Sequence, residues 1–591
     1  MNCPSRADPV HNEGWNQNPP DLNADATTRA DFEHISNARR QQDHRIDLAD
    51  SSHAEIELSE NHATDGDNTT ARLKALDGQG NIVVQSGKHL GSRTAASPVS
   101  RVYARRMARD WQLAFHGLYK RAAQIMVKYS KFIGPGFMVA VAYIDPGNYA
   151  TDVAAGASFR FKLLFIVLMS NIFAIFLQSL CIKLGSVTGM NLAENCKAHL
   201  PPWLNYVLYF FAESAIIATD IAEVIGTAIA LNILLHVPLV AGCAISIVDV
   251  LIILIFYHPS GTMRGLRAFE GFVMVLVFGV AICFCFELSQ IKNTSVGDVF
   301  RGYIPSATLI KSQALFQSCG ILGATVMPHS LYLGSGIVQP RLREYDDANN
   351  PSLTSETDSI DSEIKYRPSL AAIQSCMSYS IVELAISLFT FALFVNSSIL
   401  IVAGASLNGL PEASDADLFT IHNLLSRTLA PVAGTLFALA LLLSGTSAGI
   451  VCTISGQIVS EGQLNWTLKP WLRRLITRLI SITPSIIIAG AVGREGLGKA
   501  LQGSQVALSV ILPFVSAPLL WFTCRGRYMK VSVRNNRDVS ERDGVVEVEE
   551  AVEESVQMRN HWITAVFAVL IWGVIVVMNV ALLVLVGMGV A

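Results

Sequence analysis

The residues best able to do chemistry in this chain are polar groups placed inside long apolar segments. One such segment begins near Gly134 and contains Asp145-Pro146-Gly147-Asn148. A helix cannot pass through this tetrapeptide unbroken, because proline lacks the backbone donor and clashes with the preceding turn. Asp and Asn can cap the half-helix that restarts after the gap. In a soluble protein these residues would form an ordinary β-turn, but inside an apolar segment they predict an interrupted helix.

A second apolar segment has a matching interruption at Met327-Pro328-His329, preceded by Gly323 and Ala324. Exposed backbone at membrane depth is tolerable only where it lines a cavity, and an intramembrane acid is costly unless it is used. Two interrupted helices five spans apart favour an inverted repeat, with the substrate held where the breaks meet. The breaks therefore predict one binding site.

The groups available at the two breaks narrow the range of possible substrates. They are the Asp145 carboxylate, the Asn148 amide oxygen, the Met327 thioether and freed carbonyls such as that of Ala324. Oxygen ligands alone would suit Mg²⁺ or Ca²⁺, whereas a methionine sulfur favours softer ions such as Mn²⁺, Fe²⁺, Co²⁺ or Cd²⁺. Taken alone, Met327 would be a core-filling residue. Its neighbours favour a transition-metal ligand.

A second polar group consists of Glu213, Asp220 and Glu223, whose spacings of seven and three place the acids on one side of a helix. Intramembrane acids of this kind usually carry protons or counter-ions. The opposing candidates are His329 and the arginines Arg474 and Arg478. A purely structural salt-bridge network is the alternative interpretation. A further intramembrane acid, Asp249, has no assigned role.

The elements that position these groups are membrane helices. The chain is 51% hydrophobic and 15% charged, whereas a soluble chain carries about 25% charged residues. Apolar stretches long enough to cross a bilayer recur along the chain. The eleven expected helices are Phe132–Ala157, Leu163–Gly185, Leu204–Leu231, Leu239–Tyr257, Phe269–Ser289, Ser312–Gly336, Leu370–Ile401, Val432–Ser460, Leu472–Val492, Leu501–Cys524 and Ile563–Val590.

The connections between these helices indicate their direction. Basic residues gather after helices 4, 6, 8 and 10 and at the end of the polar N-terminal tail, so the positive-inside rule places that tail in the cytosol and the C-terminus outside. Residues 1–125 are expected to be a disordered tail, and Tyr345–Arg367 and 525–560, the latter acidic, to be loops. A sequon at Asn293 falls on the outer side, which makes this chain a candidate glycoprotein.

The Asp145-to-Asn148 and Met327-to-His329 motifs, with Asp220-Ile-Ala-Glu223 in the third helix, resemble the Nramp (natural resistance-associated macrophage protein) family of proton-coupled divalent metal transporters. The long polar segments resemble its fungal members. The resemblance implies an all-α membrane protein with a leucine-transporter-like fold. Its ten-helix core would span residues 131–524, in repeats of about 131–290 and 312–524, with 561–591 as an eleventh transmembrane helix.

The same resemblance implies roles for individual residues. Asp145, Asn148, Ala324 and Met327 would hold the metal, Gln505 would join them in some states, and protons would pass near Asp145, Asp220, Glu223, His329 and Arg478. The chain departs from the family pattern at Ser330, Gly334, Thr446 and Ile511. The departures leave the implied metal ligands intact and affect the details of gating and proton coupling.

The expected function is proton-coupled symport of Mn²⁺, Fe²⁺ and similar ions toward the cytosol, by a multi-pass monomer of the plasma membrane or an endosomal or vacuolar membrane. No resident cofactor and no nucleic-acid partner are expected. Two alternatives remain open, namely a same-fold transporter of an organic solute and a metal-sensing membrane receptor. An enzyme is not expected, because the chain has no phosphate loop, nucleophile elbow or zinc-protease motif.

Overall fold

The structure is a computed structural model that describes residues 133–246, 263–292, 294–349, 366–410, 417–464, 470–491, 493–533 and 554–589. All of these residues belong to the second of two compact units, Ser97–Ala591. The expected tail, most of Leu239–Tyr257 with Asp249, the sequon at Asn293 and the side chain of Arg474 lie outside the described residues.

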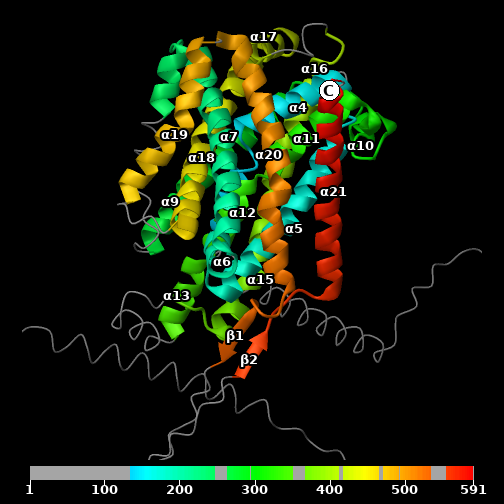
Figure 1. Ribbon diagram of the computed structural model, residues 1–591. Helices are drawn as coiled ribbons and strands as arrows, with labels where there is room; N and C mark the ends of the chain where they lie inside the picture. Colours follow the sequence, from blue (N-terminus) through cyan, green and yellow to red (C-terminus); the bar gives the residue numbers. More distant parts are fainter. Residues whose placement is uncertain are drawn as a thin grey trace, which may run out of the picture. The chain divides into compact units, whose positions relative to one another are not determined.

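The described part of the chain is almost entirely helical (Figure 1). In chain order its elements are α3 (Pro135–Val141), α4 (Pro146–Phe159), α5 (Leu164–Thr188), α6 (Leu192–His199), α7 (Pro202–Leu235), α9 (Met263–Ser289), α10 (Val296–Arg301), η1 (Ala307–Ile310), α11 (Ser312–Thr325), α12 (Pro328–Gly336), α13 (Gln339–Asn349), α15 (Leu370–Ser387), the π-helical turn η2 (Leu388–Ala392), α16 (Leu393–Ser406), α17 (Leu418–Thr428), α18 (Pro431–Leu464), α19 (Pro470–Ala491), α20 (Gly493–Cys524), β1 (Lys530–Val533), β2 (Glu554–Gln557) and α21 (Trp562–Gly587).

Eight helices in the described residues are long and apolar enough to cross a membrane. The broken pair α3 and α4 and the helix α19, whose apolar part is Arg478–Ala491, bring the spans to ten of the eleven expected. Both predicted interruptions are confirmed, because α3 and α4 are separated at residues 142–145 and α11 and α12 at residues 326–327.

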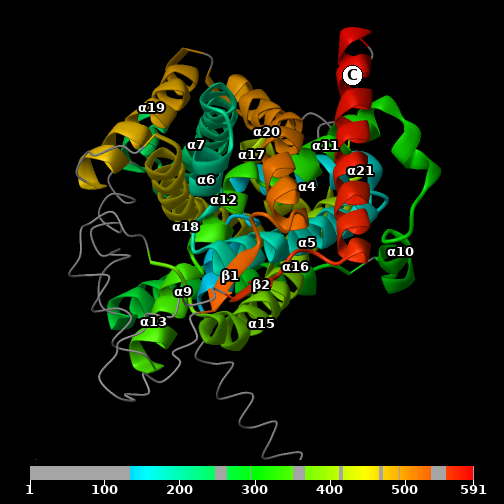
Figure 2. The same ribbon diagram turned by 60° about the horizontal axis from the view of Figure 1, so that its bottom comes forward.

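The interrupted helices lie in the interior of the described bundle. Residues 146–157 of α4 are all buried, and so are residues 318–335 across the second break. Helix α4 packs on α16, α11 and α20, while α18 packs on α7 and α9. In contrast, α21 lies at the margin against α20 and α11, and it leaves most of its apolar surface exposed (Figure 2). A helix that is apolar around its whole circumference and exposed at a margin is suited to face lipid.

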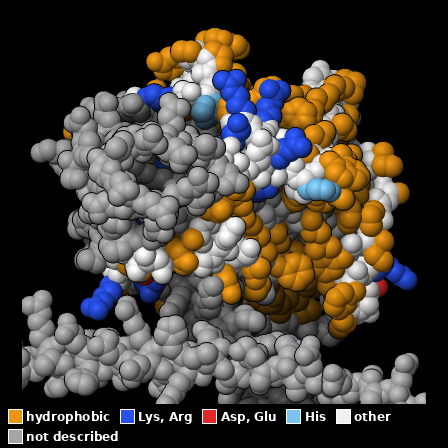
Figure 3. Space-filling view, turned by 90° about the horizontal axis from the view of Figure 1, so that it is seen from below, with side chains coloured by type: hydrophobic (Ala, Val, Ile, Leu, Met, Phe, Trp, Pro, Cys, Tyr) orange, Lys and Arg blue, Asp and Glu red, His pale blue; other side chains and the backbone are white. Residues whose placement is uncertain are grey.

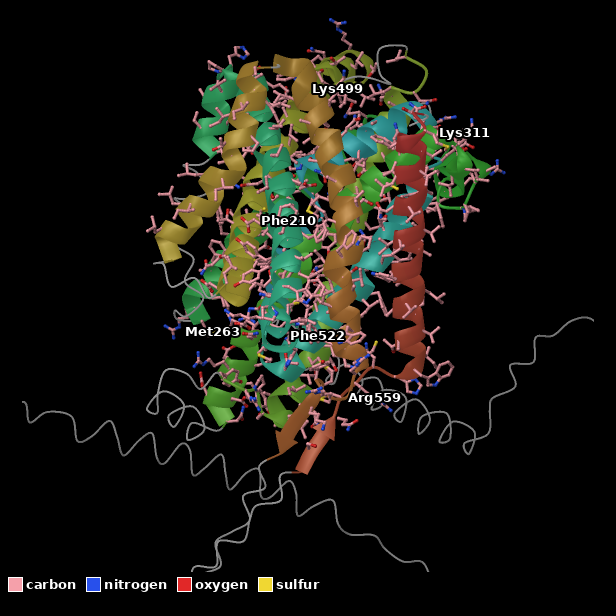
Figure 4. The ribbon with its side chains drawn as sticks, in the orientation of Figure 1. Phe210, Met263, Lys311, Lys499, Phe522 and Arg559 are labelled. Atoms are coloured by element: carbon pink, nitrogen blue, oxygen red, sulfur yellow. The ribbon has the colours of Figure 1, made fainter. Side chains whose placement is uncertain are left out.

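The helices end in two opposite regions (Figure 1). One region, called here the α17 end, contains α17, α10 and the C-terminal end of α21, with Lys311 and Lys499 nearby (Figure 4). The other, called the hairpin end, contains α13, β1 and β2, and Arg559 lies there. Lysine and arginine side chains gather on the hairpin-end face (Figure 3).

Two expected loops contain regular structure, so their interpretation as loops throughout is wrong. Helix α13 continues to Asn349, inside the expected loop Tyr345–Arg367. In the region 525–560, β1 and β2 pair antiparallel, with Lys530 opposite Gln557. Charged residues suggested loops, but buried Met529 and Val531 attach this hairpin to the helical core. The short helices α6, α10 and α17 were also not expected from the sequence.

Candidate metal centre

The first break places Asp145 at the start of a new helix. Helix α3 ends at Val141, and the next three amides bond to carbonyls three residues earlier, which tightens the chain before it leaves the helix. Asp145 caps α4, since one of its oxygens, Oδ1, accepts from the Asn148 backbone N–H at 2.9 Å and from Asn148 Nδ2 at 2.8 Å. Pro146 takes the first helical position, where its missing donor costs nothing.

Carbonyls freed by this break are satisfied from distant helices. Asn396 of α16 donates to the Tyr143 carbonyl at 2.9 Å, and Ser444 of α18 donates to the Ile144 carbonyl at 2.5 Å. All of these residues are buried. Because an unsatisfied backbone group inside a membrane is costly, Asn396 and Ser444 stabilise the non-helical geometry that exposes Asp145.

The second break meets the first through one hydrogen bond. Helix α11 ends at Thr325, and Met327 precedes α12 with extended backbone angles. Asn148 Nδ2 donates to the Ala324 carbonyl at 3.2 Å, and the Ser330 hydroxyl donates to the Met327 carbonyl at 2.7 Å. The structure therefore brings Asp145, Asn148 and Ala324 together, with Met327 three residues further along the second break.

Gln505 of α20 reaches the same place because two glycines allow close approach. A Cβ atom on Gly147 would lie 2.3 Å from Gln505 Nε2, and one on Gly323 would lie 2.0 Å from the Gln505 carbonyl oxygen. A Cβ atom on Gly147 would displace the Gln505 side chain, whereas one on Gly323 would push the α20 backbone away from the second break. Both glycines are thus required for the amide of Gln505 to contact the first break beside Asn148.

Three oxygens of this group lack a hydrogen-bond donor in the described part of the chain. They are Asp145 Oδ2, Asn148 Oδ1 and Gln505 Oε1, and their residues have no exposed surface. Met327 is equally buried. Buried acceptors without donors are costly unless a cation takes the donor's place. A divalent ion suits this combination of carboxylate, amide and carbonyl oxygens with a thioether sulfur.

The acids of α7 are linked to Arg478 of α19. Arg478 Nη1 contacts Asp220 Oδ1 and lies 3.7 Å from Glu223 Oε2, and all three side chains are buried. Glu213 is not part of this ion pair. Potential ligand atoms of Asp220, Glu223 and Cys452 lie within 4.8 Å of one another. The Arg478 guanidinium already compensates one of the two carboxylate charges, which disfavours a second metal site there.

His329, which follows the second break, contacts α7 beside this ion pair. The Thr219 hydroxyl of α7 donates to the Ala215 carbonyl at 2.9 Å and lies 3.2 Å from His329 Nδ1, so the histidine donates in that contact. Thr219 immediately precedes Asp220, and His329 follows Met327 by two residues. The imidazole therefore contacts the residue next to Asp220, and it belongs to the helix that starts at the second break.

The sequence reasoning missed a group of charged residues that holds α3 at the hairpin end. Glu383 of α15 accepts from the Gly134 and Gly136 backbone N–H groups at 3.1 and 2.7 Å, which satisfies donors at the start of α3. Beside it, Arg341 of α13 donates to Glu270 of α9 at 2.5 Å, with both side chains buried. Acids inside the apolar segments Phe269–Ser289 and Leu370–Ile401 were the available signal.

Two of the departures from the family pattern lie together. Ser330 Oγ is 3.0 Å from the Tyr143 hydroxyl, and Gln178 of α5 donates to both at 2.9 Å. A Cβ atom on Gly334 would lie 2.0 Å from Gln178 Oε1. The missing side chain at Gly334 therefore provides the space that Gln178 fills beside the second break.

Comparison with known proteins identifies relatives of this chain that are named metal transporters. The chain is 55% identical over 498 residues to the manganese transporter SMF1 of Saccharomyces cerevisiae, covering 78% of this chain and 87% of that protein. It is 54% identical over 414 residues to the iron transporter SMF3 of the same yeast, covering 70% and 85%.

A solved structure of the Eremococcus coleocola manganese transporter, in complex with an aromatic bis-isothiourea compound, is 30% identical with a TM-score of 0.60. The match covers 76% of this chain and 85% of that one. It confirms the expected all-α membrane fold of the leucine-transporter type. The model of the natural resistance-associated macrophage protein-like family matches residues 136–539, and the chain belongs to this family, Nramp.

Proposed function

We propose that this protein is a symporter that moves divalent transition-metal ions, such as Mn²⁺ and Fe²⁺, together with protons by alternating access. The names of its relatives support the substrate class, since they are manganese and iron transporters. The observation that carries the proposal is the set of buried oxygens without donors at the two breaks. A transporter, and not an enzyme, is the function that this closed site supports.

In this proposal, Asp145, Asn148, Gln505, Met327 and the Ala324 carbonyl hold the ion. Asp145 and Met327 have no exposed surface, so the described arrangement is occluded from both ends. A carboxyl group must lose its proton to bind a metal. The proton released from Asp145 passes through His329 to Asp220 and Glu223. Arg478 holds these two acids beside the histidine.

The orientation of the protein in the membrane is inferred from charge. Basic residues gather at the hairpin end, where α9 begins at Met263 (Figure 4) and where α13 and the segment from α20 to β1 lie. They are Arg264 and Arg267 of α9, Arg341 and Arg343 of α13, and Arg525 and Arg527 between α20 and β1. By the positive-inside rule this end faces the cytosol together with the N-terminal tail, and the α17 end faces outward. The protein then delivers metal to the cytosol, as a monomer in the plasma membrane or in an endosomal or vacuolar membrane.

Uptake into proteoliposomes containing the full-length protein tests this function. We expect Mn²⁺ and Fe²⁺ to enter faster than Ca²⁺, with rates that rise when the outside is acidic, and each metal to carry protons with it. In Asp145→Ala the uptake should fall to that of protein-free vesicles. The control is Asp298→Ala, which removes an exposed acid of α10 and should leave uptake unchanged. Undiminished Mn²⁺ uptake by Asp145→Ala would refute the site.

The sulfur has its own test. Met327→Leu keeps the side-chain volume but removes the thioether, so we expect the preference for Mn²⁺ over Ca²⁺ to fall by about tenfold, or about 1.4 kcal/mol. Met138→Leu, at a buried methionine of α3, is the matched control and should keep the preference. Equal discrimination by both variants would remove the sulfur from the explanation of selectivity.

A further inference from the structure

A second buried carboxylate lies between the metal centre and the α17 end. A small cavity is lined by residues of five helices, and it has no room for a water molecule. Its lining includes Val153 of α4, Glu287 of α9, Val402 of α16, Ile421 of α17 and Phe437 of α18. Glu287 contributes the one carboxylate of this lining, and the other lining side chains are apolar.

Glu287 has no partner in the part of the chain that the structure describes. The residue is completely buried, and both of its carboxylate oxygens lack a hydrogen-bond donor. An ionised carboxylate in such a place is strongly unfavourable. Because there is no space for water either, this arrangement can accommodate the charge only after the cavity opens.

The position of Glu287 relates it to the path of the ion. Helix α9 begins at Met263, toward the hairpin end, and Glu287 comes two residues before its opposite end at Ser289 (Figure 4). It therefore lies toward the α17 end, from which metal enters in the proposed direction of transport.

One aromatic layer separates the cavity from the metal centre. The Tyr149 ring, one turn along α4 from Asp145, lies 5.6 Å from the rings of both Phe284 and Phe437. Both phenylalanines also line the cavity, and Tyr149 is completely buried. Displacing this layer would join the cavity to the Asp145 site.

Asp152, seven residues after Asp145 on the same helix face, is a further buried acid whose oxygens have no donor among the described residues.

We propose that the cavity is the closed form of the outer vestibule, and that Glu287 binds a hydrated divalent transition-metal cation there before the ion reaches Asp145. This site rests on the proposed transport function and deepens it by adding a loading step. A lone carboxylate among apolar groups holds an ion weakly through its charge, whereas the mixed ligands at the breaks bind and select it. Glu287 is thus expected to set the apparent affinity for metal and not the maximal rate.

Mn²⁺ uptake into proteoliposomes measures this separation. In Glu287→Gln the KM for Mn²⁺ should rise about tenfold, while the maximal rate stays within about twofold of the wild type. Glu287→Asp keeps the charge and should restore most of the low KM. Asp298→Asn, at an exposed acid of the same end, should have the wild-type KM. A wild-type KM in Glu287→Gln, or an equally raised KM in Glu287→Asp, would overturn the proposal.

A binding measurement separates this proposal from the transport function. Val402→Cys places a reporter in the cavity, and Cys285→Ser is added to remove the native thiol that is exposed among the described cysteines. Mn²⁺ should slow its modification by a membrane-impermeant methanethiosulfonate reagent when Glu287 is present, and should not slow it with Glu287→Gln. Protection without uptake by the wild type would refute transport but retain the cation site. Protection that persists with Glu287→Gln, or no protection at all, would refute the site.

Discussion

The described bundle contains one pocket toward each of its two ends, and each pocket contains a buried glutamate. The cavity at the α17 end contains Glu287, which has no partner among the described residues. The pocket at the hairpin end lies between α3, α5, α12 and α15 and contains Glu383, which accepts from two backbone N–H groups at the start of α3. The same residue type, equally buried, is left unpaired in one pocket and is saturated in the other.

The difference indicates that the two ends close by different forces. At the hairpin end, α3 is held by charge-assisted hydrogen bonds and by the neighbouring Arg341–Glu270 pair. At the α17 end, closure depends on apolar packing of α17, α16 and α18 around the cavity. Hydrogen bonds fix one geometry, whereas apolar contacts can repack. This contrast agrees with the proposed entry of the ion at the α17 end.

The largest expected effect comes from breaking the buried ion pair at the hairpin end. Arg341→Leu leaves Glu270 as an unpaired buried charge, so the unfolding free energy should fall by about 3–5 kcal/mol. Thermal unfolding of the full-length protein in lipid nanodiscs measures this. The double variant Arg341→Leu with Glu270→Leu should recover most of the loss, because it removes both charges. No recovery would mean that the pair contributes more than charge compensation.

A smaller effect, of opposite sign at the two ends, is expected when each pocket's glutamate becomes leucine. Glu383→Leu leaves the Gly134 and Gly136 N–H groups without an acceptor and should lower the unfolding free energy by about 1–3 kcal/mol. Glu287→Leu removes an acid that has no partner and should raise it by about 1 kcal/mol. The same nanodisc measurement compares them. Changes of the same sign would contradict the contrast between the pockets.

The smallest effect is expected for an exposed pair at the hairpin end. Arg267 donates to Glu344 at 2.8 Å, and both side chains are more than one third exposed. Solvent screens such a pair, so Arg267→Ala should change the unfolding free energy by about 0.5 kcal/mol or less. The comparison with Arg341→Leu isolates burial as the variable. A loss as large as that of Arg341→Leu would show that burial does not decide the strength of these pairs.

Much of the centre could be predicted from sequence because its chemistry is inconsistent with its surroundings. A proline and an acid inside an apolar segment have few structural explanations. The helix interruptions at Asp145 and at Met327 could therefore be predicted from the sequence. The residues that satisfy the freed carbonyls at the breaks could not be predicted from the sequence. Asn396 and Ser444 are single polar residues in apolar helices, and each bonds a carbonyl more than 250 residues away. Such pairings have no local pattern and require the fold itself.

The missed hairpin and capping glutamate have a similar cause. β1 and β2 are separated by a long charged segment. Val531 lies opposite Val556 and Val533 lies opposite Glu554, so the alternation is too short to stand out. The sequence shows Glu383 as an acid in an apolar segment, but it does not reveal the role of this residue. The donors that Glu383 accepts from are backbone groups at the start of another helix. Sequence therefore locates costly groups better than it identifies what compensates them.

The Asn148 side chain has a consequence for the empty carrier. Its amide group already connects Asp145 of one break with the Ala324 carbonyl of the other. The two halves of the repeat are thus preorganised before cargo arrives, and little ordering entropy remains to be lost when an ion binds. The same Asn148–Ala324 hydrogen bond lets the protein keep its two halves in register while it returns, without metal, to the outward-facing state.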